Sequence, residues 1–233
     1  MKMFDLTGKK AIVTGGNSGY GLAIANGLRE AGAEVAVLDV AGEGFSVNPR
    51  SRKSIERGFA EALDKLGTID ILINALEVIP NFPSADAPDE IWDEVMDVDM
   101  TAKFVLCQLA GRVMLEKGYG KIVNLASILS FFGGENVTAY SSAMGAVTQI
   151  SKTLCNEWAG RGINVNCIAP GYLENDPRLS GDDYSRQQLL SRIPAGRWCR
   201  YEDVAGLGVF LSSSASDYIN GTVTLVDGGH YVR

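Results

Sequence analysis

The chain has 233 residues, of which 46% are hydrophobic, and its 21 basic and 28 acidic side chains give a formal net charge of −7. This length and apolar content allow one sizeable buried core, so we expect a single domain over residues 1–233. The dispersed acidic charge disfavours nucleic acid and anionic membranes as partners, and no apolar run reaches the ~20 residues that span a bilayer.

The four cysteines show no metal-ligand spacing, and the first residues lack a signal-peptide pattern. We therefore expect reduced thiols, no metal site and a cytoplasmic protein. The one histidine, His230, lies close to the C-terminus, and nothing places it beside a serine as the base of a Ser-His-Asp hydrolase.

The first predicted strand, Lys10–Thr14, runs into a glycine-rich turn and then into an apolar helix pattern, and a second strand follows at Glu34–Leu38. Glycines between a strand and a helix let backbone N–H groups and the positive helix end approach a pyrophosphate. The turn therefore predicts dinucleotide contacts from Gly15, Asn17, Ser18, Gly19, Tyr20 and Gly21.

Asp39 ends the second predicted strand, 18 residues after Gly21. A carboxylate there accepts hydrogen bonds from the adenosine ribose hydroxyls and repels a 2′-phosphate, so we predict NAD rather than NADP. The alternative is a solvated loop aspartate.

The segment after Asp39 leaves little room for a third parallel strand. Only Ala41–Gly44 separate Val40 from Phe45-Ser46-Val47, and a helix pattern occupies Ser54–Leu66. A parallel neighbour needs a connection of a dozen or more residues, usually a helix. We therefore expect a doubly wound, Rossmann-like α/β fold with six parallel strands in the order 2-1-4-5-6-7. The usual third strand and its crossover helix would be missing, and residues 41–52 irregular.

The middle of the chain continues the alternation of strands and helices. A strand at Asp70–Asn74 is followed by Ala75-Leu76-Glu77, and a long helical pattern over Glu90–Met114 carries Asp99 and, one turn later, Lys103. A buried-strand pattern at Ile122–Ala126 ends at Ser127. The next helical pattern begins near Val137 and has one face with steps of three or four residues, made by Tyr140, Met144, Val147, Ile150, Ser151, Leu154 and Trp158.

The last predicted strand, Ile163–Ile168, leads to Pro170-Gly171 and then to a polar segment, Glu174–Ser191. Three arginines in or next to this segment are either contacts for a substrate carboxylate or solvated charges: Arg178, Arg186 and Arg192.

Three of these features together resemble the short-chain dehydrogenase/reductase family: the TGGNSGYG turn, Ser127 thirteen residues before Tyr140, and Pro170-Gly171. Within the family, the chain is most similar to the branch that oxidises 2-deoxygluconate and 3-deoxy-2-ketogluconate sugars. Three stretches carry this similarity: NLASILSFFGG, INVNCIAPGYL and the tail from Arg192. The resemblance implies hydride transfer between NAD(H) and a secondary alcohol or ketone of a small-molecule sugar acid or polyol, in a homodimer or homotetramer. It also implies that Ser127 holds the substrate oxygen and Tyr140 passes the proton, with cofactor contacts from Asn74, Pro170, Gly171 and Leu173.

The chain departs from the family pattern at its proton relay. Met144 stands where the family places a lysine, Asp99 where it commonly has an asparagine, and Glu77 where it has a glycine. Methionine is uncharged and donates no hydrogen bond. An unperturbed tyrosine, with a pKa of about 10, is ionised to roughly one part in a thousand near pH 7, so we expect weakened catalysis. Lys103 is either a substitute cation for the relay or one half of an ordinary helix pair with Asp99.

Two functions from different classes remain open on the sequence. One is an NAD-dependent oxidoreductase with weakened catalysis, which the retained Ser127 and Tyr140 favour. The other is a nucleotide-binding homologue that has lost redox catalysis and acts as a regulatory or scaffolding subunit. A third interpretation, non-redox proton transfer by the Ser127–Tyr140 pair, is disfavoured because Asp39 and the glycine turn are kept.

Overall fold

The computed structural model describes residues 2–176, 179 and 183–233. Its centre is a seven-stranded sheet in the order β3-β2-β1-β4-β5-β6-β7, in which every neighbouring pair is parallel. This confirms the predicted Rossmann-like α/β class. The strands are β1 (Lys10–Thr14), β2 (Glu34–Asp39), β3 (Phe45–Ser46), β4 (Ile71–Asn74), β5 (Gly120–Leu125), β6 (Ile163–Pro170) and β7 (Val223–Val226).

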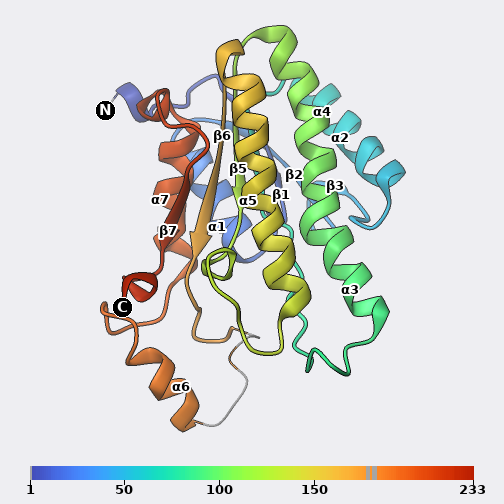
Figure 1. The fold of residues 1–233 in the computed structure, drawn as a ribbon. Helices are drawn as coiled ribbons and strands as arrows, with labels where there is room; N and C mark the ends of the chain where they lie inside the picture. Colours follow the sequence, from blue (N-terminus) through green and yellow to red (C-terminus); the bar gives the residue numbers. More distant parts are fainter. Residues whose placement is uncertain (1, 177–178, 180–182) are drawn as a thin grey trace.

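Helices cover both faces of the sheet (Figure 1). On one face lie α1 (Gly19–Glu30) and α7 (Tyr201–Ser212), and on the other α2 (Arg52–Leu66), α4 (Ala102–Lys117) and α5 (Thr138–Trp158). Successive strand residues face opposite layers. In β4, Leu72 belongs to the core under α2 and α4, whereas Ile71 and Ile73 belong to the core under α1 and α7. The central strands are buried on both faces, so most of their side chains are apolar. The polar exceptions in β5, Lys121 and Asn124, are hydrogen-bonded.

The prediction of six strands is wrong. A third strand exists, and it pairs in parallel with β2 through Leu38 with Phe45 and Asp39 with Ser46. The connection can be short because β3 pairs with only the last two residues of β2. The chain therefore returns only to the carboxyl end of β2 and does not run back along the whole strand. Gly44 makes this step possible with a φ of 100°, and a Cβ there would lie 2.4 Å from the Val37 carbonyl oxygen.

The rule that parallel strands need a connection of a dozen or more residues applies to strands of full length. A two-residue edge strand does not need so long a connection. No helix lies between β2 and β3, where every residue is described, so the predicted loss of the crossover helix is confirmed. The predicted irregular segment is accordingly interrupted by β3, and α2 begins at Arg52 with the Ser51 side chain accepting from the Ser54 N–H.

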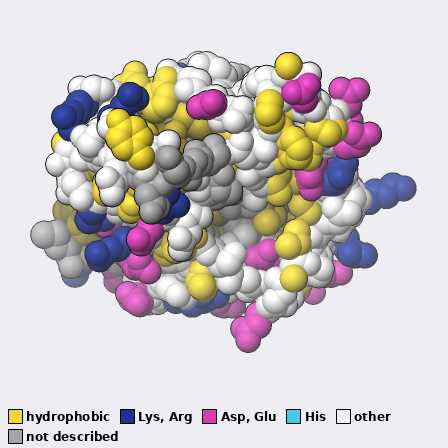
Figure 2. Space-filling view, turned by 90° about the horizontal axis from the view of Figure 1, so that it is seen from below, with side chains coloured by type: hydrophobic (Ala, Val, Ile, Leu, Met, Phe, Trp, Pro, Cys, Tyr) yellow, Lys and Arg dark blue, Asp and Glu magenta, His cyan; other side chains and the backbone are white. Residues whose placement is uncertain are grey.

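The remaining helices lie toward the carboxyl ends of the strands. They are α3 (Asp89–Val95), which continues through a π-helical turn at Met96–Thr101 into α4, and α6 (Asp183–Leu190) at the lower edge in Figure 1. Figure 2 looks onto this edge, where apolar side chains gather beside a hollow in the surface. Ligands of open α/β sheets bind outside the carboxyl ends of the strands, so this edge is where a site is expected. None of the helices described is long and apolar enough to cross a membrane.

Candidate active site

A cavity of about 420 Å³ lies at the carboxyl ends of β1 and β2. Helix α1 starts at its edge, and the Ser18 side chain does not cap that helix, which leaves first-turn N–H groups for a ligand. Gly15 has a φ of 66°, and a Cβ on it would lie 3.0 Å from the Ala75 backbone. These features fit the pyrophosphate of a dinucleotide. Six of the predicted cofactor residues line the cavity: Gly15, Ser18, Gly19, Tyr20, Asp39 and Leu173.

Asp39 is buried and already holds the glycine turn in place. Its Oδ2 accepts from the Asn17 N–H at 3.0 Å and its Oδ1 from the Val40 N–H at 2.7 Å. The Asn17 side chain in turn donates to the carbonyls of Ala41 and Glu43, which ties the turn to the short β2–β3 loop. Each carboxylate oxygen has a second lone pair, so Asp39 can still accept from a ribose hydroxyl at the cavity wall.

Other predicted cofactor residues do not reach this cavity. Asn74 is buried between β4 and α4, where its Nδ2 donates to Asn124 Oδ1 at 2.8 Å. Gly21 packs against the turn itself, since a Cβ there would lie 2.1 Å from the Gly15 carbonyl oxygen. Pro170 ends β6, and Gly171 packs on the backbone of Asp227. None of these four residues lines the cavity, and no direct cofactor contact is shown for them.

Ser127 lies in the turn after β5, and this turn is fastened to the helix that carries Tyr140. Ser127 caps a short 3-10 helix at Ile128–Ser130, and its Oγ accepts from the Leu129 N–H at 3.2 Å. The Ser130 hydroxyl donates to the Met144 carbonyl oxygen at 3.0 Å, so this turn is fastened to the part of α5 that carries Tyr140. Both predicted catalytic side chains are buried.

Met144 is fully buried one helical turn after Tyr140. It packs in an apolar cluster with Val95, Ile128 and Tyr140. The sequence prediction that Tyr140 and Met144 share a buried face of one helix is confirmed. Met144 brings no charge and no donor to the tyrosine.

Glu77 contacts the hydroxyl of Tyr140. The hydroxyl donates to Glu77 Oε2 at 3.1 Å, and Glu77 also lines the dinucleotide-sized cavity. In the sequence, Glu77 stands out only because the family pattern has a glycine at its position. The two residues lie 63 positions apart, and no pattern in the sequence signals their contact.

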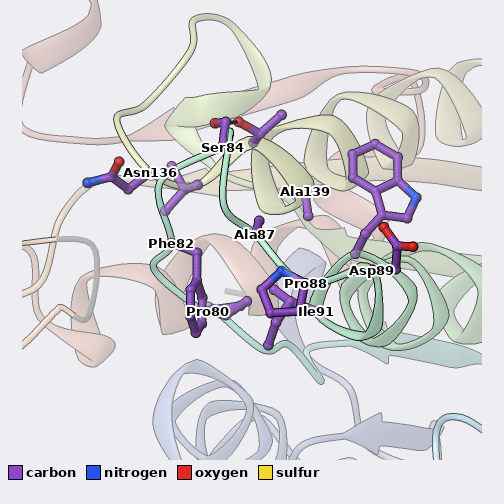
Figure 3. A pocket seen from close by; sticks show the side chains of 12 residues that line it. Pro80, Phe82, Ser84, Ala87, Pro88, Asp89, Ile91, Asn136 and Ala139 are labelled. Atoms are coloured by element: carbon purple, nitrogen blue, oxygen red, sulfur yellow. Dashed lines mark hydrogen bonds between the residues drawn. The ribbon is translucent and has the colours of Figure 1, made fainter.

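The segment that carries Glu77 is anchored to the start of α5. The Phe82 N–H donates to the Asn136 carbonyl at 2.8 Å, and the hydroxyls of Ser84 and Thr138 are hydrogen-bonded to each other. Between them lies a second cavity of about 280 Å³, in which Pro80, Phe82, Pro88 and Ile91 lie close together (Figure 3). These contacts hold residues 77–88 against the helix that presents Tyr140.

Asp99 lies in the π-helical turn, with none of its surface exposed. Its Oδ1 accepts from the Val78 N–H at 2.8 Å, and its Oδ2 has no partner among the described residues. Burial raises the pKa of Asp99 to about 8, although the charge of Lys103 acts in the opposite direction. Lys103 is itself buried, and its Nζ donates to the Leu125 carbonyl oxygen at 2.8 Å. Lys103 is therefore not the surface half of a helix pair but a buried cation behind the serine-bearing turn.

We expect Asp99→Asn to stabilise the protein more at pH 7 than at pH 5. The pKa of Asp99 is raised in the folded state, so between roughly pH 4 and 8 the unfolded chain ionises this group while the folded chain keeps it protonated, and stability falls as pH rises. The stabilisation by Asp99→Asn should therefore be about 2–3 kcal/mol larger at pH 7 than at pH 5, since each pKa unit corresponds to about 1.4 kcal/mol. Urea unfolding of wild type and variant at both pH values measures this difference in the free energy of unfolding. Asp93→Asn, at an exposed position in α3, is the control. An equal gain at both pH values would contradict the argument.

Comparison with known proteins places the chain in a family. The sequence model described as enoyl-(acyl carrier protein) reductase, a model of short-chain dehydrogenases/reductases, matches residues 15–231. The chain belongs to the short-chain dehydrogenase/reductase family, as its motifs predict.

Within the family, the chain is similar to sugar-acid dehydrogenases. It is 41% identical to the 2-dehydro-3-deoxy-D-gluconate 5-dehydrogenase of Bacillus subtilis, with 99% of this chain and 97% of the relative covered. The crystal structure of a putative 2-deoxy-D-gluconate 3-dehydrogenase from Agrobacterium tumefaciens with bound NADP superposes with a TM-score of 0.92 at 41% identity, over 100% of both chains. A gluconate 5-dehydrogenase from Burkholderia cenocepacia, in complex with NADP and tartrate, has a TM-score of 0.94 at 31% identity over 100% of this chain and 98% of that one.

Proposed function

We propose that this protein is a nicotinamide-dependent oxidoreductase that interconverts a secondary alcohol and a ketone on a sugar acid, with NAD as the preferred cofactor. The observation that carries this proposal is the hydroxyl of Tyr140, hydrogen-bonded to Glu77 beside a cavity built from the glycine turn and Asp39. The relatives named for gluconate derivatives support the substrate class, and the complex of one of them with tartrate, a dicarboxylate, is consistent with it. A cytoplasmic homodimer or homotetramer of 233-residue domains is part of the same proposal.

In this proposal Tyr140 moves the proton, and a nicotinamide cofactor, when bound, would supply the hydride chemistry. During oxidation the substrate hydroxyl gives its proton to the Tyr140 oxygen, and the Tyr140 proton passes to Glu77 Oε2. Glu77 lets this step proceed without a neighbouring ammonium, and a positive charge beside Tyr140 would speed it further by lowering the pKa of the tyrosine. In the reduction direction the protonated Glu77 returns the proton through Tyr140 to the carbonyl oxygen. Ser127 orients the substrate oxygen from the adjoining turn.

The cofactor preference is tested through Asp39. We expect the wild type to oxidise members of a panel of sugar acids with NAD at higher kcat/KM than with NADP, because the carboxylate repels a 2′-phosphate. The two solved relatives described above are complexes with NADP, so a preference for NAD would distinguish this chain from them. Asp39→Asn removes the charge and keeps one of the two acceptor oxygens that Asp39 uses, and it should reduce the discrimination about tenfold. An unchanged ratio in the variant would mean that another group contacts the ribose, and no NADH formation from any acid would contradict the proposed activity.

A second candidate function is favoured by one observation, the fully buried Met144 in place of a relay cation. This candidate is a nucleotide-binding homologue without redox turnover, acting as a regulatory or scaffolding subunit. Titration of NAD and NADH into the purified protein discriminates the two functions when it is read beside the activity panel. Binding with no turnover on any sugar acid or polyol would favour the second candidate.

A further inference from the structure

His230 is a buried group that the proton transfer at Tyr140 does not use. It is the chain's one histidine, its exposed fraction is 8%, and its Nδ1 has no hydrogen-bond partner among the residues described. A buried polar atom without a partner costs free energy, and the cost is recovered when a ligand supplies that partner. Burial lowers the pKa of His230, Asp227 acts to raise it, and Arg192 lowers it further.

The turn before His230 fixes where the ring lies. Gly228 and Gly229 have φ values of 64° and 87°. The Asp227 carboxylate accepts from the N–H groups of Gly229 at 2.9 Å and Tyr231 at 2.7 Å. Because left-handed backbone and these two hydrogen bonds define the turn, the imidazole is held in position before any ligand arrives.

The ring lines a cavity of about 370 Å³ that also contains two guanidinium groups. Arg186 of α6 and Arg192, just after that helix, line it together with His230, and Glu135 is the one carboxylate among its described lining residues. Arg178, the third arginine that the sequence suggested for a substrate carboxylate, lies outside the described residues. Two arginines against one glutamate give the cavity a positive balance, which favours an anionic ligand.

This cavity lies next to Tyr140. Val137 lines it three residues before Tyr140 at the start of α5, and Tyr172 lines it from the segment after β6. Both side chains pack with Tyr140 in one apolar cluster, and the Tyr172 ring lies 5.7 Å from the imidazole, centroid to centroid. The cavity and Tyr140 therefore lie on either side of the same packed side chains.

We propose that this cavity is the carboxylate subsite of the sugar-acid substrate, in which Arg192, Arg186 and the His230 ring hold the acid group while the reacting carbon lies at Tyr140. The subsite rests on the proposed function for its orientation, but binding of a sugar acid does not require turnover. Guanidinium groups bind carboxylates through charge-assisted and often bidentate hydrogen bonds. A nearby carboxylate also favours the protonated imidazole, so binding should raise the pKa of His230.

The single histidine makes the test direct, because one imidazole signal in the proton NMR spectrum reports this cavity alone. D-Gluconate and D-glucitol are matched probes, since they differ in a carboxylate against a hydroxymethyl group. We expect gluconate, with and without NADH, to shift the His230 signal and raise its pKa, and glucitol to do neither. Arg192→Gln should weaken gluconate binding about tenfold or more, whereas Arg57→Gln, on the exposed side of α2, should leave it unchanged.

The outcomes separate this subsite from the proposed activity. If gluconate and glucitol shift the His230 signal alike, if gluconate does not bind, or if Arg192→Gln binds gluconate as the wild type does, the subsite is wrong, even where a dehydrogenase activity is measured. If gluconate binds through Arg192 and raises the pKa of His230 but no sugar acid is turned over, the subsite stands and the proposed oxidoreductase activity fails.

Discussion

Met144→Lys should raise the dehydrogenase turnover of this protein at neutral pH by one order of magnitude or more. Met144 is fully buried one helical turn after Tyr140, so an ammonium introduced there would lie beside the tyrosine. A positive charge lowers the pKa of a neighbouring tyrosine, and each unit corresponds to about 1.4 kcal/mol between the two protonation states. NAD affinity should also tighten, because a lysine at this position would reach the nicotinamide ribose, as the family pattern implies.

The measurement is NADH formation from a panel of sugar acids and polyols with wild type and variant side by side. Met144→Gln, a neutral polar variant of similar length, separates the effect of charge from that of disturbing the apolar cluster around Met144. Equal and readily measured activity in wild type and Met144→Lys would refute the argument. The buried Lys103 would then be the candidate for the missing cation, and the activity of Lys103→Met would test it.

Glu77→Gln should lower turnover in alcohol oxidation by about a hundredfold and leave NAD affinity nearly unchanged. The Glu77 carboxylate accepts a hydrogen bond from the Tyr140 hydroxyl at 3.1 Å. A well-positioned proton acceptor typically raises the rate of a reaction 10²–10⁴-fold. Glutamine keeps the size and an acceptor oxygen but cannot take the proton. The limb of the pH–rate profile that reports ionisation of the acceptor should therefore disappear.

Tyr140→Phe and the double variant complete this experiment. If the two residues act as one unit, the double variant should be no slower than the worse single variant, because coupled groups are not additive. Glu90→Gln, an exposed acid at the start of α3, is the control. Full activity and an unchanged pH profile in Glu77→Gln would leave Glu77 with a structural role alone.

The fold was predictable wherever local patterns decide it. The apolar strand runs, the glycine turn before α1 and the stepped apolar face of α5 each have a local physical cause, and the structure has them where the patterns predict. The edge strand β3 was not predictable in this way, because it depends on left-handed glycines and on pairing with only two residues of β2.

The candidate site was predictable only in part, for a related reason. The cofactor cavity follows from residues close together in the sequence, and Gly15, Ser18 and Asp39 all line it. The partner of Tyr140 comes from the segment after β4, and the buried pair of Asp99 and Lys103 depends on how α4 packs on β5. Such contacts join elements far apart in the chain, where neither periodicity nor spacing carries a signal.

The shortness of β3 also affects whether copies of the protein can aggregate through the edges of their sheets. An outer strand presents unpaired N–H and C=O groups, and a long flat one recruits strands of other molecules into aggregates. Here the outermost strand at one side is the two-residue Phe45–Ser46, after which the chain turns away into α2. The opposite border, Val223–Val226, is only four residues long. Neither edge strand offers a row of unpaired backbone groups long enough to seed fibre-like association, although no helix lies between β2 and β3 to cover that side.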